Sequence, residues 1–183
     1  MTILEKKSIL PEKMENYIYN TLTSKEFPWY YRDNISYTEV TPRNINEYGF
    51  VHMVDYYGNA TGNGYLDSFN DLIKSTIPIF EKEFNIQYSS IGRIRIGLQT
   101  KVSESSVLYK PHTDSRRPHS SVIYYVNDSD GDTIFYKGQS YQENVRIKPE
   151  KGKAICFNDS LFHGGSSPVV NSKRIVINFL FRK

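Results

Sequence analysis

The sequence predicts a mainly β fold with flanking α-helices, arranged as a double-stranded β-helix, or jelly roll. After Tyr88 the apolar segments are short and are separated by Gly, Asp, Asn or Pro, as strands and turns are. Before that point residues 65–84 form one long amphipathic stretch, suited to cover the outer face of a sheet. Many short strands beside one such helix favour a jelly roll.

The first 48 residues are expected to form a helical and irregular support for the core. Pro11 suits the first turn of a short helix reaching about residue 23, because Met14, Ile18 and Leu22 recur at four-residue steps. An aromatic segment and a polar loop then continue to about residue 46.

Residues 49–183 are expected to form the jelly-roll core, so that residues 1–183 make one domain. A strand over residues 50–57 precedes the outer helix over residues 65–84, whose apolar side chains recur every three or four residues. Further strands are expected at residues 91–99, 121–127, 133–136, 144–148, 153–157 and 174–181.

Strict alternation over residues 91–99 predicts two different faces for this strand. One face carries Ile94, Ile96 and Leu98, and the other carries Arg93, Arg95 and Gln99. If the apolar face packs beneath the outer helix, the polar face points into the barrel, where it could contact a substrate or co-substrate.

Composition limits the kind of protein. The chain has 183 residues, a net charge of +3 and no apolar run long enough to cross a membrane. It has no long Lys/Arg run of the kind that marks a nucleic-acid site, so nucleic acid is not an expected partner. Cys156 is the single cysteine, which excludes an intramolecular disulfide and favours a cytoplasmic protein. It falls in a predicted buried strand, where we expect an unreactive thiol.

A possible metal site begins at His112-Thr113-Asp114. In an extended segment the first and third residues point to the same side, so an imidazole and a carboxylate can reach one ion. His163 follows 49 residues after Asp114, a separation that suits a ligand from the opposite sheet. Two histidines and one carboxylate are the ligand set of non-haem iron(II) oxygenases, although zinc accepts the same ligands.

Arg174 lies eleven residues beyond His163, at the start of a strand that is apolar on both faces. A buried guanidinium needs an acceptor, and a carboxylate matches its planar fork. The alternatives are a protein acid such as Asp159, or solvent exposure at the strand end.

Together His112, Asp114, His163 and Arg174 resemble the motif of the 2-oxoglutarate/iron(II) dioxygenase superfamily, over roughly residues 91–181. The resemblance implies an enzyme in which the first three residues hold iron(II). It implies that Arg174 grips the C5 carboxylate of 2-oxoglutarate, the co-substrate, and that turnover releases succinate and CO₂. It also allows ascorbate as an accessory reductant.

Local similarity favours the prolyl-4-hydroxylase branch, and the whole chain looks like small phage-encoded members. The segment Ile123-Tyr124-Tyr125-Val126-Asn127 is similar to the one that follows the His-x-Asp motif in that branch. By this match Tyr125 hydrogen-bonds the C5 carboxylate, and Tyr109 and Asn178 are further candidates for the co-substrate site. Leu180 stands where prolyl hydroxylases commonly carry tryptophan, which leaves proline specificity open.

The expected activity is therefore hydroxylation of a protein side chain or a small molecule. A nucleobase-modifying enzyme of the AlkB-like branch is one alternative, although Leu180 replaces its second arginine. A non-enzymatic jelly-roll binding or structural protein is the other. Specificity is expected to reside in the loops at residues 30–46, 57–64 and 101–107. Arg116, Arg117 and His119 are interpreted as an exposed basic turn beside the site.

Overall fold

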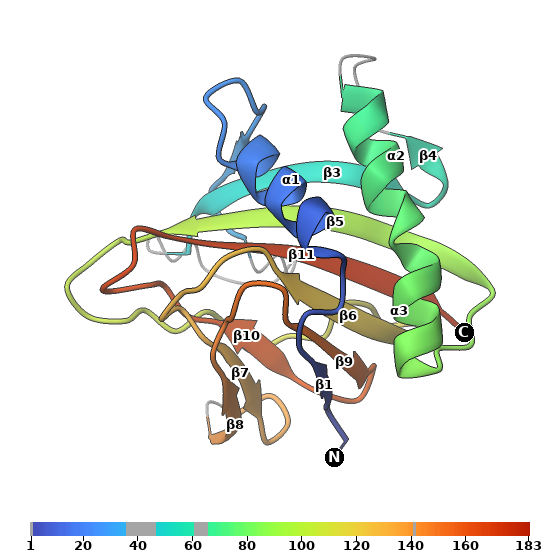
Figure 1. Cartoon of the computed structure of the whole chain (residues 1–183). Coiled ribbons are helices and arrows are strands. Elements are labelled where there is room, and N and C mark those ends of the chain that lie inside the picture. The colour runs from blue at the N-terminus through green and yellow to red at the C-terminus, as the bar shows by residue number, and fades with distance from the viewer. Residues whose placement is uncertain (1, 36–46, 61–65, 141) are drawn as a thin grey trace.

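The computed structural model describes residues 2–35, 47–60, 66–140 and 142–183, and two antiparallel sheets confirm the expected mainly β jelly roll (Figure 1). Within these residues the larger sheet has the order β1-β9-β6-β11-β5-β3-β2, with β4 paired to β3. Its strands are β1 (Leu4–Lys6), β2 (Tyr30–Arg32), β3 (Gly49–Tyr56), β4 (Asn59–Ala60), β5 (Ser90–Thr100), β6 (His119–Tyr125), β9 (Ala154–Asn158) and β11 (Lys173–Arg182). The smaller sheet has the order β10-β7-β8, with strands β7 (Thr133–Tyr136), β8 (Glu143–Ile147) and β10 (His163–Gly165).

Three helices cover one face of the larger sheet, and the smaller sheet lies on the other side (Figure 1). They are α1 (Glu12–Leu22), α2 (Asp67–Ser75) and α3 (Ile77–Phe84). Their apolar side chains form one buried core with the outward side chains of β5, β6 and β11, including Ile18, Leu22, Phe69, Ile73, Phe80, Ile94, Ile96, Val122, Ile177 and Phe179. The predicted packing of the apolar face of β5 beneath the helices is therefore confirmed.

The outer helix expected over residues 65–84 is two helices, and that expectation was wrong. The break falls at Thr76, between α2 and α3. Pro78 has no backbone N–H, so it cannot donate the helical hydrogen bond to the carbonyl of Lys74. The hydroxyl of Thr76 donates to the carbonyl of Ile73 at 2.6 Å, which satisfies one of the last acceptors of α2.

The N-terminal support also contributes to the larger sheet. β1 pairs with β9, and β2 pairs with β3, so these two strands occupy the ends of the strand order. Each has three residues, all exposed, and a segment that short and solvated has no alternation that a sequence pattern could reveal.

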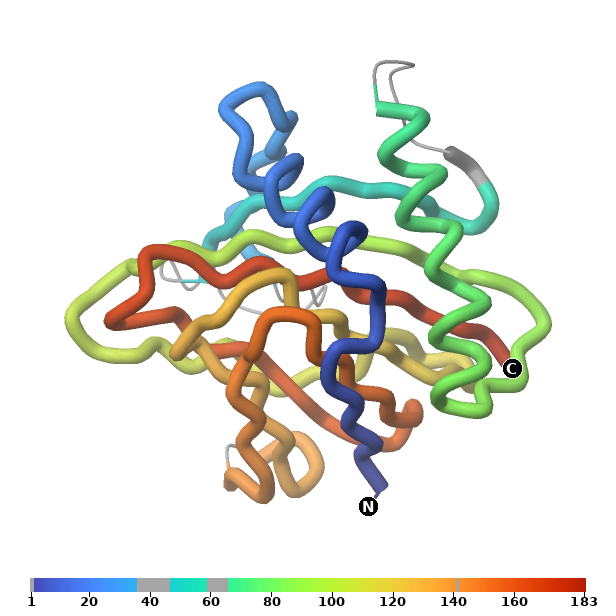
Figure 2. The backbone as a smooth tube through the Cα atoms, in the orientation of Figure 1, coloured from blue at the N-terminus to red at the C-terminus, as the bar shows by residue number. Residues whose placement is uncertain are grey.

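The register of β11 places a row of polar side chains on the inner face of the larger sheet. β11 lies between β5 and β6 in the strand order and runs alongside β5 over its whole length (Figure 2). Arg174 is opposite Gln99, and Asn178 is opposite Arg95. Directly opposed residues point to the same face, so these four side chains face the smaller sheet.

Among the described residues, no helix combines the length and the apolar character that crossing a bilayer requires.

Candidate metal and anion site

Backbone pairing brings the two histidines together. His112 lies in the segment between β5 and β6, and His163 opens β10. The N–H of each donates to the carbonyl of the other at 2.9 Å. The Asp114 side chain lies beside them, with its Oδ2 3.6 Å from Nε2 of His163. Ligand atoms from the three residues all lie within 4.8 Å of one another, close enough to hold one metal ion. His112, Asp114 and His163 are together called the metal cluster below.

Both imidazoles present a lone pair to this cluster. Nδ1 of His112 contacts the carbonyl of Lys110 at 3.0 Å, and Nδ1 of His163 contacts the carbonyl of Leu161 at 3.2 Å. A carbonyl only accepts, so each Nδ1 carries the proton and each Nε2 is free to ligate. Burial lowers the pKa of His163, and burial with the His163 charge lowers the pKa of His112 to about 4. Both rings are therefore neutral near pH 7, the form that binds metals.

Asp114 is held as an oriented anion. Ser121 donates its hydroxyl to Oδ2 at 2.6 Å, and the Asn178 amide donates to the same oxygen at 3.2 Å. Arg93 donates to Oδ1 at 2.7 Å. Burial alone would raise the pKa of Asp114, but His163, Arg93 and these hydrogen bonds hold it well below its usual value. The carboxylate is ionised and its rotamer is fixed before any metal binds.

Removing the Ser121 hydroxyl should weaken metal binding. Loss of a partner that orients a ligand typically lowers metal affinity by about 10- to 100-fold, and we expect Ser121→Ala to fall in that range. Titration calorimetry with manganese(II) measures it. Ser120→Ala is the matched control, because Ser120 lines a different cavity and should bind manganese like the wild type. Equal losses in the two variants would contradict the role of Ser121.

Arg174 is a buried cation that has no acidic partner among the described residues. Its residue is 4% exposed, and its two terminal nitrogens donate to neutral acceptors: Nη1 to Gln99 Oε1 at 2.6 Å and Nη2 to Thr133 Oγ1 at 2.7 Å. Its Nε has no hydrogen-bond partner. No carboxylate of the described residues lies within ion-pair distance of it, and Asp159 instead accepts from the backbone N–H of His119. Both protein-internal explanations of Arg174, a pair with Asp159 and solvent exposure, are therefore wrong.

Hydroxyl groups surround this guanidinium. Tyr125 donates its hydroxyl to Thr133 Oγ1 at 2.8 Å, and the Arg174 Cζ lies 5.9 Å from the Tyr125 ring centre. The Tyr109 hydroxyl is buried and has no partner. Burial raises the pKa of both phenols to about 12, so both remain donors. Unused donors on Arg174 and Tyr109 fit a bound carboxylate.

One cavity joins the metal cluster to this anion site. His112, Asp114, His163, Thr133, Arg174 and Asn178 all line it. Asn178, expected in the co-substrate site, makes its hydrogen bonds to Asp114 and Arg93.

Sequence reasoning missed Ser121 and Thr133. Ser121 shares its strand face with Tyr125, and that spacing would have placed it inside the barrel.

Gly164, which follows His163 in β10, packs closely against the backbone of Tyr109. A Cβ at this position would lie 2.6 Å from the backbone oxygen of Tyr109. Gly164→Ala should therefore push β10 away from the segment that carries His112, and overpacking of this kind costs about 1–3 kcal/mol of unfolding free energy. Differential scanning calorimetry should show a lower Tm. For Gly97→Ala the nearest atom would be 3.8 Å away, so that control should keep its Tm. An unchanged Tm in Gly164→Ala would contradict the close packing.

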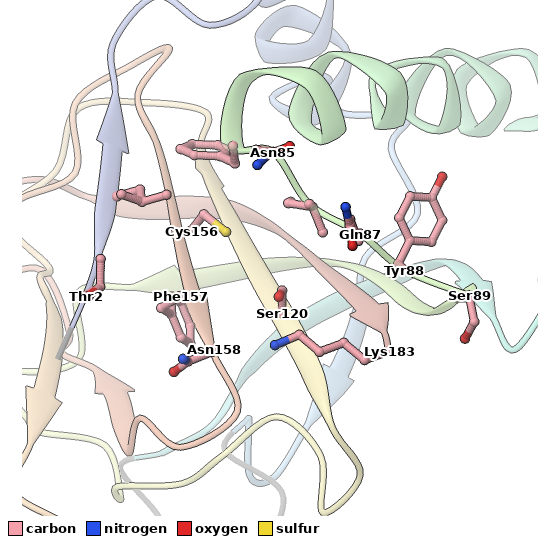
Figure 3. Close-up of a pocket in the computed structure, with 13 residues that line it drawn as sticks. Thr2, Asn85, Gln87, Tyr88, Ser89, Ser120, Cys156, Phe157, Asn158 and Lys183 are labelled. Atoms are coloured by element: carbon pink, nitrogen blue, oxygen red, sulfur yellow. The ribbon is translucent and has the colours of Figure 1, made fainter.

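A second cavity lies elsewhere. It measures about 700 Å³, lies between β1, β9 and the segment after α3, and contains none of the metal cluster (Figure 3). Cys156 lines it, and burial raises the pKa of that thiol to about 11, as expected for an unreactive cysteine. The arrangement of donors, and not the size of a cavity, identifies the candidate site.

The family comparison matches the part of the chain that holds the site. A model of the 2OG-Fe(II) oxygenase superfamily matches residues 98–182, which include the three candidate metal ligands and Arg174. No curated protein matches the chain significantly.

Solved structures show the same fold at low sequence identity. A prolyl hydroxylase from Trichoplax adhaerens, in complex with a hypoxia inducible factor peptide, has a TM-score of 0.64 at 14% identity, covering 98% of this chain and 83% of that one. A prolyl-4-hydroxylase from Pseudomonas putida has 0.60 at 13%, covering 99% and 92%. A 2OG-Fe(II) family oxidoreductase from Burkholderia pseudomallei has 0.66 at 15%, covering 99% and 84%.

Proposed function

Because residues 98–182 match a model of the 2OG-Fe(II) oxygenase superfamily, we propose that this chain is an iron(II)- and 2-oxoglutarate-dependent oxygenase and that it hydroxylates a C–H bond of a protein side chain or a small molecule. The reaction consumes O₂ and 2-oxoglutarate and yields succinate, CO₂ and the hydroxylated product. The solved structures with this fold include enzymes named for peptide or prolyl substrates, and this supports an organic side chain as the target. In the proposed assignment residues 1–183 act as one oxygenase domain.

Each residue of the site has a distinct role in this proposal. His112, Asp114 and His163 would hold iron(II), which would activate O₂, the oxidant of the hydroxylation, with 2-oxoglutarate as co-substrate. Arg174 binds the C5 carboxylate, and the hydroxyls of Tyr125 and Tyr109 complete that pocket. Asn178 keeps Asp114 in place, as its hydrogen bond to Oδ2 indicates.

The observation that carries the proposal is the buried guanidinium of Arg174, whose partners in the described part of the chain are all neutral and which lines the same cavity as the metal cluster. A charge buried without a counter-ion is costly, and a dicarboxylic co-substrate with its other end at the metal removes that cost. Zinc bound by the same three residues would not explain why a second anion site opens into the cavity.

Anaerobic addition of iron(II) and 2-oxoglutarate tests the proposal. A visible charge-transfer band should form only when both are present, because it requires the 2-oxo acid to chelate the iron. Admitting O₂ should then release succinate, which mass spectrometry quantifies. Absence of the band at saturating ligand would refute the oxygenase assignment, and succinate release with a candidate peptide or metabolite library would identify the substrate class.

A further inference from the structure

Two more guanidiniums lie near the candidate metal ligands, and one of them, that of Arg95, lines their cavity. Arg93 and Arg95 come from the inner face of β5, two residues apart. Arg93 is committed to Asp114 and Asn178. Arg95 lines the cavity beside His112 and Asp114, opposite Asn178 in the strand register.

Among the described residues Arg95 has few acceptors. The one hydrogen bond that it makes to them goes to the carbonyl of Ile35 at 3.3 Å, a weak contact for a group with five N–H donors. Within the described residues no carboxylate lies at ion-pair distance from it, and Asp114, the nearest acid by its electrostatic effect, is already paired with Arg93. Burial and the Arg93 charge lower the pKa of Arg95 to about 10, so it remains a cation at neutral pH.

Counted over the described residues, the loaded site carries an excess of positive charge. Iron(II) and the dianion 2-oxoglutarate cancel one another, and the two imidazoles are neutral. Asp114 cancels the charge of Arg93. The charges of Arg95 and Arg174 then remain in one cavity, and among the described residues lining it Asp114 is the only acid. A low-dielectric site with such an excess of positive charge favours an anionic ligand.

We propose that the primary substrate carries a carboxylate or phosphate group, and that Arg95 binds this group beside the metal. This inference rests on the proposed oxygenase function and narrows its substrate class to anionic molecules or acidic side chains. Arg95 is then a specificity-determining residue, and its planar fork gives the substrate a fixed orientation.

Anion binding to the loaded protein tests Arg95 directly. The protein is saturated with manganese(II) and 2-oxoglutarate, so that Arg174 is occupied, and is then titrated calorimetrically with sodium sulfate at constant ionic strength. The wild type should bind sulfate at one saturable site. Arg95→Gln should weaken that binding by about tenfold or more, and Arg95→Lys by less. Acetate and methyl phosphate in place of sulfate then distinguish a carboxylate from a phosphate preference.

The matched control is Arg116→Gln, which removes an exposed arginine near the metal motif. It should bind sulfate like the wild type. Absence of saturable sulfate binding in the wild type, unchanged binding in Arg95→Gln, or an equal loss of 2-oxoglutarate affinity in that variant would each overturn the inference. The iron(II) and 2-oxoglutarate band is measured on the same protein preparations, loaded anaerobically with iron(II) in place of manganese(II). A band without sulfate binding rejects only the role of Arg95, whereas a missing band rejects the oxygenase assignment itself.

Discussion

Asp114→Asn should nearly abolish iron(II) binding while leaving the fold intact. The substitution preserves shape but removes the only negative charge among the three candidate ligands, and it leaves Arg93 facing the ion without its counter-ion. Loss of a ligand-orienting partner already costs about 10- to 100-fold in metal affinity, so loss of the charged ligand should cost more than about 100-fold. Metal analysis after anaerobic loading and desalting measures the effect.

The control for this result is Asp128→Asn, the same chemical change at an exposed position that accepts a hydrogen bond from the Lys151 backbone. It should retain iron like the wild type. Circular dichroism and Tm separate loss of the ligand from loss of the fold. If Asp114→Asn bound iron(II) as tightly as Asp128→Asn, the metal centre would have to be located elsewhere.

Arg174→Ala should raise the Kd for 2-oxoglutarate far more than the Kd for the metal. Truncating one partner of a buried, hydrogen-bonded charge pair costs about 2–5 kcal/mol, which corresponds to roughly 30- to several-thousand-fold in affinity. Arg174 is not a partner of any of the three metal ligands, so manganese(II) should bind within a few-fold of wild type. Calorimetric titration of each ligand separates the two effects.

Arg174→Lys provides a graded comparison. It restores the charge but cannot donate through a planar fork to Gln99, Thr133 and a carboxylate together, so its 2-oxoglutarate affinity should lie between those of Arg174→Ala and the wild type. Wild-type 2-oxoglutarate affinity in Arg174→Ala would exclude this residue as the carboxylate clamp.

The parts of the fold that could be predicted are those in which a periodic pattern repeats often enough to be read. Alternation over residues 91–99 gave both the core face and the inward polar face of β5, and four-residue spacing gave α1. β1, β2 and β10 have three residues each, and their pairing is set by tertiary contacts. The break at Thr76 depends on one missing N–H at Pro78, which the apolar pattern does not register.

The candidate site likewise has residues that could be predicted from the sequence and residues that could not. His112, Asp114, His163 and Arg174 could be selected because their residue types and spacing indicate a chemistry. Their supporting partners could not, because a serine or threonine hydroxyl is too common to stand out in a sequence. Ser121 and Thr133 acquire their roles only through tertiary contacts, which bring Ser121 to Asp114 and Thr133 to Arg174.

One strand also fixes the distance between the two parts of the candidate site. Arg174 and Asn178 lie on the same face of β11, four residues apart, and a strand rises about 3.3 Å per residue, so their Cα atoms are separated by roughly 13 Å. Backbone hydrogen bonds on both sides of β11 keep that interval rigid. The separation between the anion site at Arg174 and the support of Asp114 at Asn178 is thus a property of main-chain geometry.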